Sequence, residues 1–224
     1  MMDWSAFALS LKLATWTMII LFPMGIWLGR LLAWRHFPGK ALLEGILALP
    51  LVLPPTVLGY YLLVALGGVS PIGRLYQDIL GRQLVFSFEG LLLASVLFNL
   101  PFAIQPMQRA FESISPEVRE AAACSGLSRW RSLWRIELPL AWPGILSALV
   151  LTFAHTLGEF GVVLMVGGNI PGETRTIAIS IYDKVQGFEF AAAGFMSAVL
   201  LVISLLAISI SFLSIRSRAR LRHA

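Results

Sequence analysis

Five long stretches without a charged residue constrain the fold of this chain more than any other feature. The stretches cover 13–29, 45–73, 90–108, 138–158 and 190–215, which are 17, 29, 19, 21 and 26 residues long. About 20 apolar residues in a helix cross a bilayer core of about 30 Å. Within the second stretch, 67–73 is rich in glycine and reads as a loop. The sequence therefore predicts five spanning helices, near 10–33, 42–66, 88–111, 139–165 and 191–215.

The composition supports a membrane protein and excludes several other classes. Of the 224 residues, 58% are hydrophobic and 13% are charged, whereas soluble domains are about 45–50% apolar and about 25% charged. A soluble enzyme and a disordered chain are therefore excluded, and a single cysteine allows no disulfide within the chain. With no internal repeat and no flexible linker, the sequence predicts one all-α, polytopic transmembrane bundle as a single domain over 1–224.

The distribution of lysine and arginine predicts the topology. With five spans, the segments 30–44, 109–137 and 216–222 lie on one side of the membrane and carry 12 of the 17 basic residues. The positive-inside rule makes that side cytoplasmic. We therefore expect the N-terminus outside and the C-terminus in the cytoplasm. The net charge of +5 then reflects topology, and no nucleic-acid partner is expected.

The segment 172–187 does not fit a simple span. Ile177, Ile181 and Val185 form an apolar stripe at helical spacing, but four charged residues interrupt the segment. An amphipathic helix on the outer surface is the favoured interpretation. A sixth, partly inserted helix is the alternative.

The cytoplasmic segment at about 112–139 is longer and more organised than a simple connection. Ser115-Pro116-Glu117 is a helix start, with serine as the cap and proline at the first helical position. Gly126 suits a left-handed position at the helix end, and Ser128 can cap a second helix. A short helix parallel to the membrane is therefore predicted.

A spaced pattern in this segment resembles the EAA loop of ATP-binding-cassette importer permeases. Its fixed positions are Glu120, Ala121, Ala122, Gly126, Ile136, Leu138 and Pro139. The resemblance implies that these residues couple the chain to a cytoplasmic ATPase, with Glu120 docking directly on it. Because no G-x-x-x-x-G-K-[S/T] phosphate loop occurs, the chain is not expected to be an enzyme. ATP and Mg would be bound by partner ATPase subunits, and this chain would bind no cofactor and no metal.

Other stretches resemble the permeases of molybdate importers. They are Leu49–Tyr61, His155–Gly161 and Met165–Thr174. The resemblance implies a bacterial inner-membrane permease that forms, as a homodimer in the lipid bilayer, an alternating-access pathway for molybdate, with tungstate as a further candidate. Two ATPase subunits would drive it, and a periplasmic or surface-anchored binding protein would deliver the oxyanion. A permease of the same class for sulfate, thiosulfate or another oxyanion is the alternative.

Four polar residues in the spans are candidates for the pathway or its gate. Asn99, Thr152 and Thr156 could present neutral donors to a dianion, or could equally hold helices together. Glu159, counted along a continuous helix, falls near the outer interface. It could pair with a basic residue and help form an outer gate, or could simply reach water.

Trp130 and Trp134 lie four residues apart among arginines. An interfacial helix with its aromatic side chains in the headgroup region is the favoured interpretation. Direct contact with the ATPase is the alternative.

Overall fold

The computed structural model describes the backbone of residues 2–221 and the side chains as far as Ser209. The described part is built from helices and contains no strand. In chain order the elements are α1 (Trp4–Trp34), α2 (Lys40–Val52), α3 (Pro55–Leu66), α4 (Pro71–Leu80), α5 (Phe88–Glu112), α6 (Pro116–Cys124), α7 (Arg129–Ser132), the π-helical turn η1 (Leu133–Glu137), α8 (Leu138–Leu157), α9 (Gly161–Gly167), α10 (Ile177–Gln186) and α11 (Phe190–Leu221).

Among the described residues, four helical segments are long and apolar enough to cross a membrane. They are α1, α5, α11 and the continuous run from α7 through α8. The pair α2 and α3 also qualifies, but it is bent by 112°. Counted as one span, this pair gives the predicted five, and the predicted helix at 88–111 is confirmed almost to the residue by α5.

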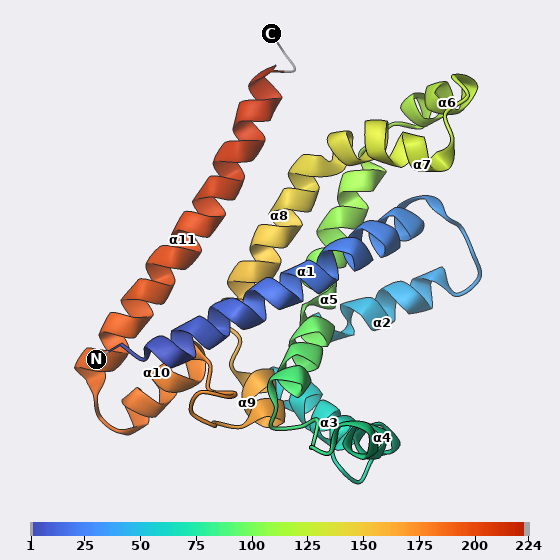
Figure 1. Ribbon diagram of the computed structural model, residues 1–224. Helices are drawn as coiled ribbons and strands as arrows, with labels where there is room; N and C mark the ends of the chain where they lie inside the picture. Colours follow the sequence, from blue (N-terminus) through green and yellow to red (C-terminus); the bar gives the residue numbers. More distant parts are fainter. Residues whose placement is uncertain (1, 222–224) are drawn as a thin grey trace.

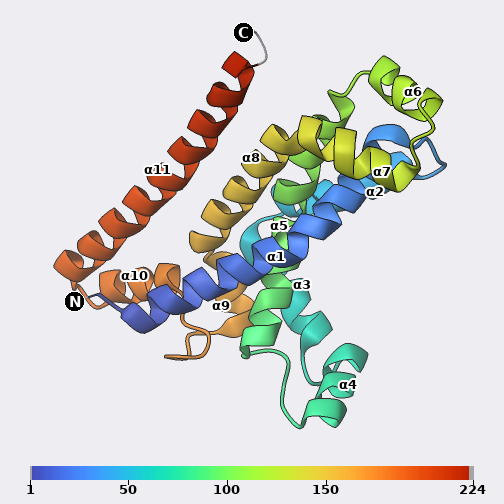
Figure 2. The same ribbon diagram turned by 45° about the horizontal axis from the view of Figure 1, so that its top comes forward.

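The helices order the molecule into two ends. At one end lie α6, α7 and the C-terminal part of α11, and at the other lie the N-terminus, α10 and α4 (Figure 1). The same separation is visible after rotation (Figure 2). The segment 109–137 and the end of α11 thus share one end, as expected when two spans, α8 and α11, separate them.

The core is centred on α5, which packs against α1, α8, α9 and α2. Glycines let the backbones of these helices approach closely. A Cβ on Gly29 of α1 would lie 2.9 Å from the backbone nitrogen of Gln108, and one on Gly144 of α8 would lie 2.5 Å from Ala110 Cβ. In lipid, such close packing replaces the hydrophobic driving force that joins helices in water.

The predicted continuous helix at 42–66 is wrong, because α2 and α3 are separate. Leu53 and Pro54 adopt extended backbone, and α3 begins at Pro55. Proline restrains the preceding residue to extended conformations and lacks the N–H that would continue the helix. The segment is therefore apolar as predicted, but two consecutive prolines turn the chain within it.

The predicted continuous helix at 139–165 is also wrong. The helix α8 ends at Leu157, and α9 begins at Gly161 after a three-residue turn. A Cβ on Gly161 would lie 2.8 Å from Pro55 Cβ. The turn therefore directs α9 onto the start of α3. Hydropathy does not predict this contact, because both segments are apolar.

Two short helices lie at the N-terminal end of the molecule. The predicted amphipathic helix within 172–187 is present as α10, and its ten residues are about 15 Å long and too short to span. Sequence analysis missed α4, where Ser70 Oγ accepts from Gly73 N at 2.9 Å and Pro71 is the first residue. The signal was available, because Ser-Pro also begins the predicted helix at Ser115-Pro116.

Candidate functional site

The segment 112–139, called the coupling segment after its predicted role, forms a short helix that extends beyond the bundle (Figures 1 and 2). Its helix α6 begins after Ser115 with Pro116 in the first turn, as predicted. Its end is also as predicted, because Gly126 has φ +71° and Leu127 N–H donates to the Ala122 carbonyl at 3.2 Å. Local capping thus sets where α6 begins and ends.

The residues of the EAA pattern divide into exposed and packed positions. Glu120, Ala121 and Gly126 are exposed, whereas Ala122 is buried against the chain. The short side chains of Ala121, Ala123 and Cys124, which are all exposed, let a second protein approach the helix backbone there. Docking of the ATPase at these residues stays a prediction, and the exposed face of α6 is where it would occur.

The second half of the pattern lies where η1 becomes α8. Ile136 and Leu138 are half-buried, and Pro139 is exposed as an early residue of α8. A π turn is a wide and uncommon geometry that is frequent at functional sites. It connects the coupling segment directly to a spanning helix, so a displacement of α7 would be passed to α8.

Trp34 joins the coupling helix to two spanning helices. The Arg119 guanidinium of α6 lies over the Trp34 ring, 4.0 Å from its centroid. The indole Nε1 donates to the Phe111 carbonyl at 3.2 Å, and the Trp34 ring packs edge-on against the Phe111 ring. The tryptophan at the end of α1 is therefore a shared contact of α6 and α5.

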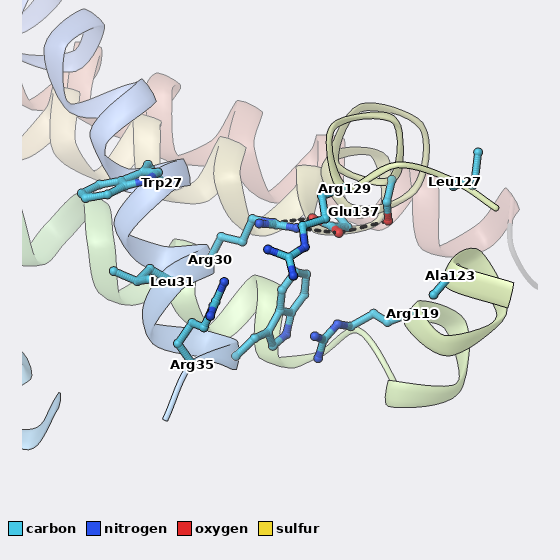
Figure 3. Close-up of a pocket in the computed structure, with 11 residues that line it drawn as sticks. Trp27, Arg30, Leu31, Arg35, Arg119, Ala123, Leu127, Arg129 and Glu137 are labelled. Atoms are coloured by element: carbon cyan, nitrogen blue, oxygen red, sulfur yellow. Dashed lines mark hydrogen bonds and ion pairs between the residues drawn. The ribbon is translucent and has the colours of Figure 1, made fainter. Parts of the chain in front are cut away.

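A buried ion pair fixes the other side of the segment. Glu137 in η1 receives two hydrogen bonds from Arg30 of α1 and one from Ser132 Oγ at 3.1 Å (Figure 3). Arg30 entered the prediction only through the topology, and Glu137 was not among the predicted site residues. Both charges lie at the end of a charge-free stretch, next to 13–29 and 138–158, and this was a signal for the pair.

Glu159 does not lie at the outer interface, in contrast to the prediction. It is 4% exposed, and its Oε2 accepts from Ser95 Oγ at 2.9 Å and from Asn99 Nδ2 at 3.2 Å. Asn99 lies about 17 Å along α5 from Phe88 and about 20 Å from Glu112, so Glu159 is at mid-depth. The helix break after Leu157 brings the carboxylate back into the bundle.

Asn99 links His155 and Glu159, which lie four residues apart in the sequence. Its Oδ1 lies 2.9 Å from His155 Nδ1, and its Nδ2 reaches Glu159. The His155 ring also stacks on Phe102, with centroids 3.9 Å apart. His155 and Glu159 therefore meet through a side chain of α5 and not through direct i, i+4 contact.

Thr152 and Thr156 lie in the same interior. Both are buried, and Thr156 Oγ1 donates to the Thr152 carbonyl one turn earlier at 2.8 Å. Thr152 Oγ1 and Glu159 Oε1 have no hydrogen-bond partner among the described residues. All four pathway candidates are thus buried within one chain, on α5, on α8 or just after α8, and their role in a pathway stays a prediction.

Comparison with known proteins places these features in a family. Residues 22–223 match the family described as "Binding-protein-dependent transport system inner membrane component". The chain is 43% identical to the molybdenum transport system permease protein ModB of Azotobacter vinelandii over 98% of this chain and 97% of that protein. It is 42% identical to ModB of Escherichia coli K12 over 91% of each. It is 31% identical to the sulfate transport system permease protein CysT of E. coli K12, over 80% of this chain and 65% of that protein.

A solved structure shows the same fold. A bacterial ABC transporter that imports the acidic polysaccharide alginate aligns with a TM-score of 0.77 and 20% identity, over 95% of this chain and 78% of that one. At this identity the likeness extends to the fold alone.

Proposed function

We propose, since this chain belongs to the family of binding-protein-dependent transport system inner membrane components, that it conducts molybdate into the cell. Members of the family are permeases and not enzymes, and the ATPase is a separate subunit. The chain is accordingly an inner-membrane permease that works with an ATPase and a periplasmic binding protein. The observation that carries the substrate is the 43% identity with ModB of A. vinelandii over 98% of this chain.

Two copies of the chain would form the pathway. Five spans are few to enclose a route for a tetrahedral dianion, and symmetric dimers are the commonest oligomers. Closure of two ATPase subunits on ATP would move α6, and the contacts of Trp34 and Glu137 would pass that movement to α1, α5 and α8. The pathway would then alternate between inward-facing and outward-facing states by rigid-body motion.

Uptake of labelled molybdate tests the substrate. Cells that lack only this chain are compared with cells in which it is restored, with trace molybdate offered alone and with a large excess of sulfate. Restored uptake that sulfate barely suppresses supports a molybdate permease. Uptake that sulfate abolishes would instead favour the sulfate alternative, in line with the weaker similarity to CysT.

A further inference from the structure

A basic pocket lies between the cytoplasmic end of α1 and the coupling segment. It has a volume of about 390 Å³ and is lined by Arg30, Arg35, Arg119 and Arg129, with Glu137 as its one carboxylate. The arginines come from α1, from the residue that follows α1, from α6 and from α7, and their side chains point toward one another across the pocket (Figure 3). Elements far apart in the sequence thus concentrate positive charge in one place.

Most of this charge is uncompensated within the described part of the chain. Glu137 is paired with Arg30, and no carboxylate among the described residues forms an ion pair with Arg35, Arg119 or Arg129. Like charges that converge without counterions repel one another. An anionic ligand would remove this repulsion, so the pocket is complementary to a negatively charged group.

An apolar groove opens from the basic pocket. It has a volume of about 990 Å³ and runs between α1 and the α7–α8 segment. Trp27, Arg30 and Arg129 line both spaces, so the pocket and the groove adjoin each other. The remaining lining is Phe22, Pro23, Ile26, Trp130, Leu133, Trp134, Leu138, Pro139 and Trp142.

The composition of this composite site is typical of the boundary between headgroups and acyl chains. Tryptophan is enriched at that boundary, and the groove contains four: Trp27, Trp130, Trp134 and Trp142. The side chains of Trp130 and Trp134 are 67% and 57% exposed. Basic pockets between spanning helices on the cytoplasmic side are suited to anionic lipid headgroups.

We propose that this site binds one anionic phospholipid, with its phosphate among Arg35, Arg119 and Arg129 and its acyl chains in the groove. A free oxyanion or a carboxylate of the ATPase would satisfy the arginines but leave the apolar groove open. A zwitterionic lipid would bring its own cation into a pocket that already has an excess of positive charge. Because Arg119 belongs to α6 and Arg35 follows α1, the bound lipid would bridge the coupling helix and the bundle.

Native mass spectrometry of the intact transporter tests the proposal. The complex is equilibrated with phosphatidylglycerol or with phosphatidylcholine, and retained lipid is counted per permease chain. We expect retention of phosphatidylglycerol only. Removing one arginine should weaken retention about fivefold, so the double variant R35Q/R129Q should weaken it about 25-fold. The matched control is R109Q/R131Q, because Arg109 and Arg131 are exposed and line neither space.

A second pair of variants probes the groove without touching the arginines. Ile26→Trp fills the groove and should also release the lipid, whereas Ile19→Trp, at an exposed site elsewhere on α1, should not. Equal loss from both arginine doubles, or no loss from either, would overturn the proposal. Displacement by millimolar inorganic phosphate would identify a free-anion site instead. A disulfide between cysteines introduced into the grooves of two copies would likewise overturn it, because a second copy would then occupy the groove. Protection of Arg129 from chemical modification only when ATPase is bound would also overturn it, because the ATPase would then cover the arginine.

Discussion

Arg30 and Glu137 are 107 residues apart in the sequence and form a two-pronged ion pair at the base of the coupling segment. Arg30 Nε lies 2.5 Å from Glu137 Oε2, and Nη2 lies 3.0 Å from Oε1. The glutamate side chain is only 4% exposed, while that of the arginine is 31% exposed. The pair therefore fixes η1 to α1 in an orientation that a single hydrogen bond would not define.

Substitution of Glu137 should destabilise the chain more than the same change in an exposed pair. Glu137→Gln places an amide donor against the guanidinium, and we expect a loss of about 2 kcal/mol. The matched control is Glu89→Gln, whose partner Arg82 is 56% exposed, and here a loss below about 1 kcal/mol is expected. Thermal unfolding of the purified transporter measures both. Equal shifts for the two variants would contradict a special role for the buried pair.

Gly29 should tolerate alanine less well than Gly25, although both face α5. A Cβ at Gly29 meets the backbone of Gln108 and Met107, whereas one at Gly25 meets the flexible end of the Met107 side chain. We expect Gly29→Ala to cost about 1–3 kcal/mol, because helix backbones must separate. Gly45→Ala, where a Cβ meets nothing within 4 Å, is the control. A stability order with Gly25→Ala as the worst variant would refute this packing account.

Gly126 should require a residue that accepts left-handed backbone. Its φ is +71°, and an added Cβ would meet nothing within 4 Å of this chain. Gly126→Val should therefore cost about 1–2 kcal/mol through backbone strain alone, reorient α7 and reduce ATPase co-purification and uptake. Asparagine adopts this conformation more readily, so Gly126→Asn should retain more of both. Wild-type behaviour of the valine variant would show that the turn is unimportant for coupling.

Glu159 should be replaceable by glutamine with little effect on the fold. The amide oxygen of Glu159→Gln can still accept from Ser95 and Asn99, so we expect stability within about 1 kcal/mol of the wild type. Glu159→Ala leaves two buried donors without their acceptor and should cost about 1–3 kcal/mol. Uptake by the glutamine variant then reports on the charge alone. Unchanged uptake would mean that the carboxylate is structural and does not act as a gate.

Cys124 provides a native probe of topology. It is the only cysteine in the sequence, and it is exposed on α6. A membrane-impermeant maleimide should therefore label the chain in inside-out vesicles and not in intact spheroplasts. Bound ATPase should slow this labelling if α6 is the docking helix. Labelling from outside alone would invert the topology, and labelling that ATPase leaves unchanged would argue against docking near Cys124.

Several elements were predictable because their signals are local. The helix α5 occupies an uninterrupted apolar run, and α6 is bounded by a Ser-Pro start and by Gly126. Such signals depend on a few neighbouring residues, since capping and backbone preference act within a turn of helix. The same locality explains the miss at α4, whose Ser70-Pro71 start was present but lay beside a glycine-rich loop.

The placement of Glu159 could not be predicted in the same way. Counting along a continuous helix put it at the outer interface, but the turn after Leu157 returned it to Asn99 in the middle of α5. Hydropathy records how apolar a segment is and not the direction in which it runs. Only the packing of α9 against α3 decides that direction.

The sequence by itself determined the number of apolar segments, the basic side of the protein and the capped coupling helix. These follow from bilayer thickness, charge asymmetry and local backbone preference, each of which is a property of neighbouring residues. The tertiary structure alone decided the bend between α2 and α3, the buried network around Asn99 and the pairing of Arg30 with Glu137. Those features depend on which distant surfaces come into contact, and contact between distant segments is settled only when the helices pack.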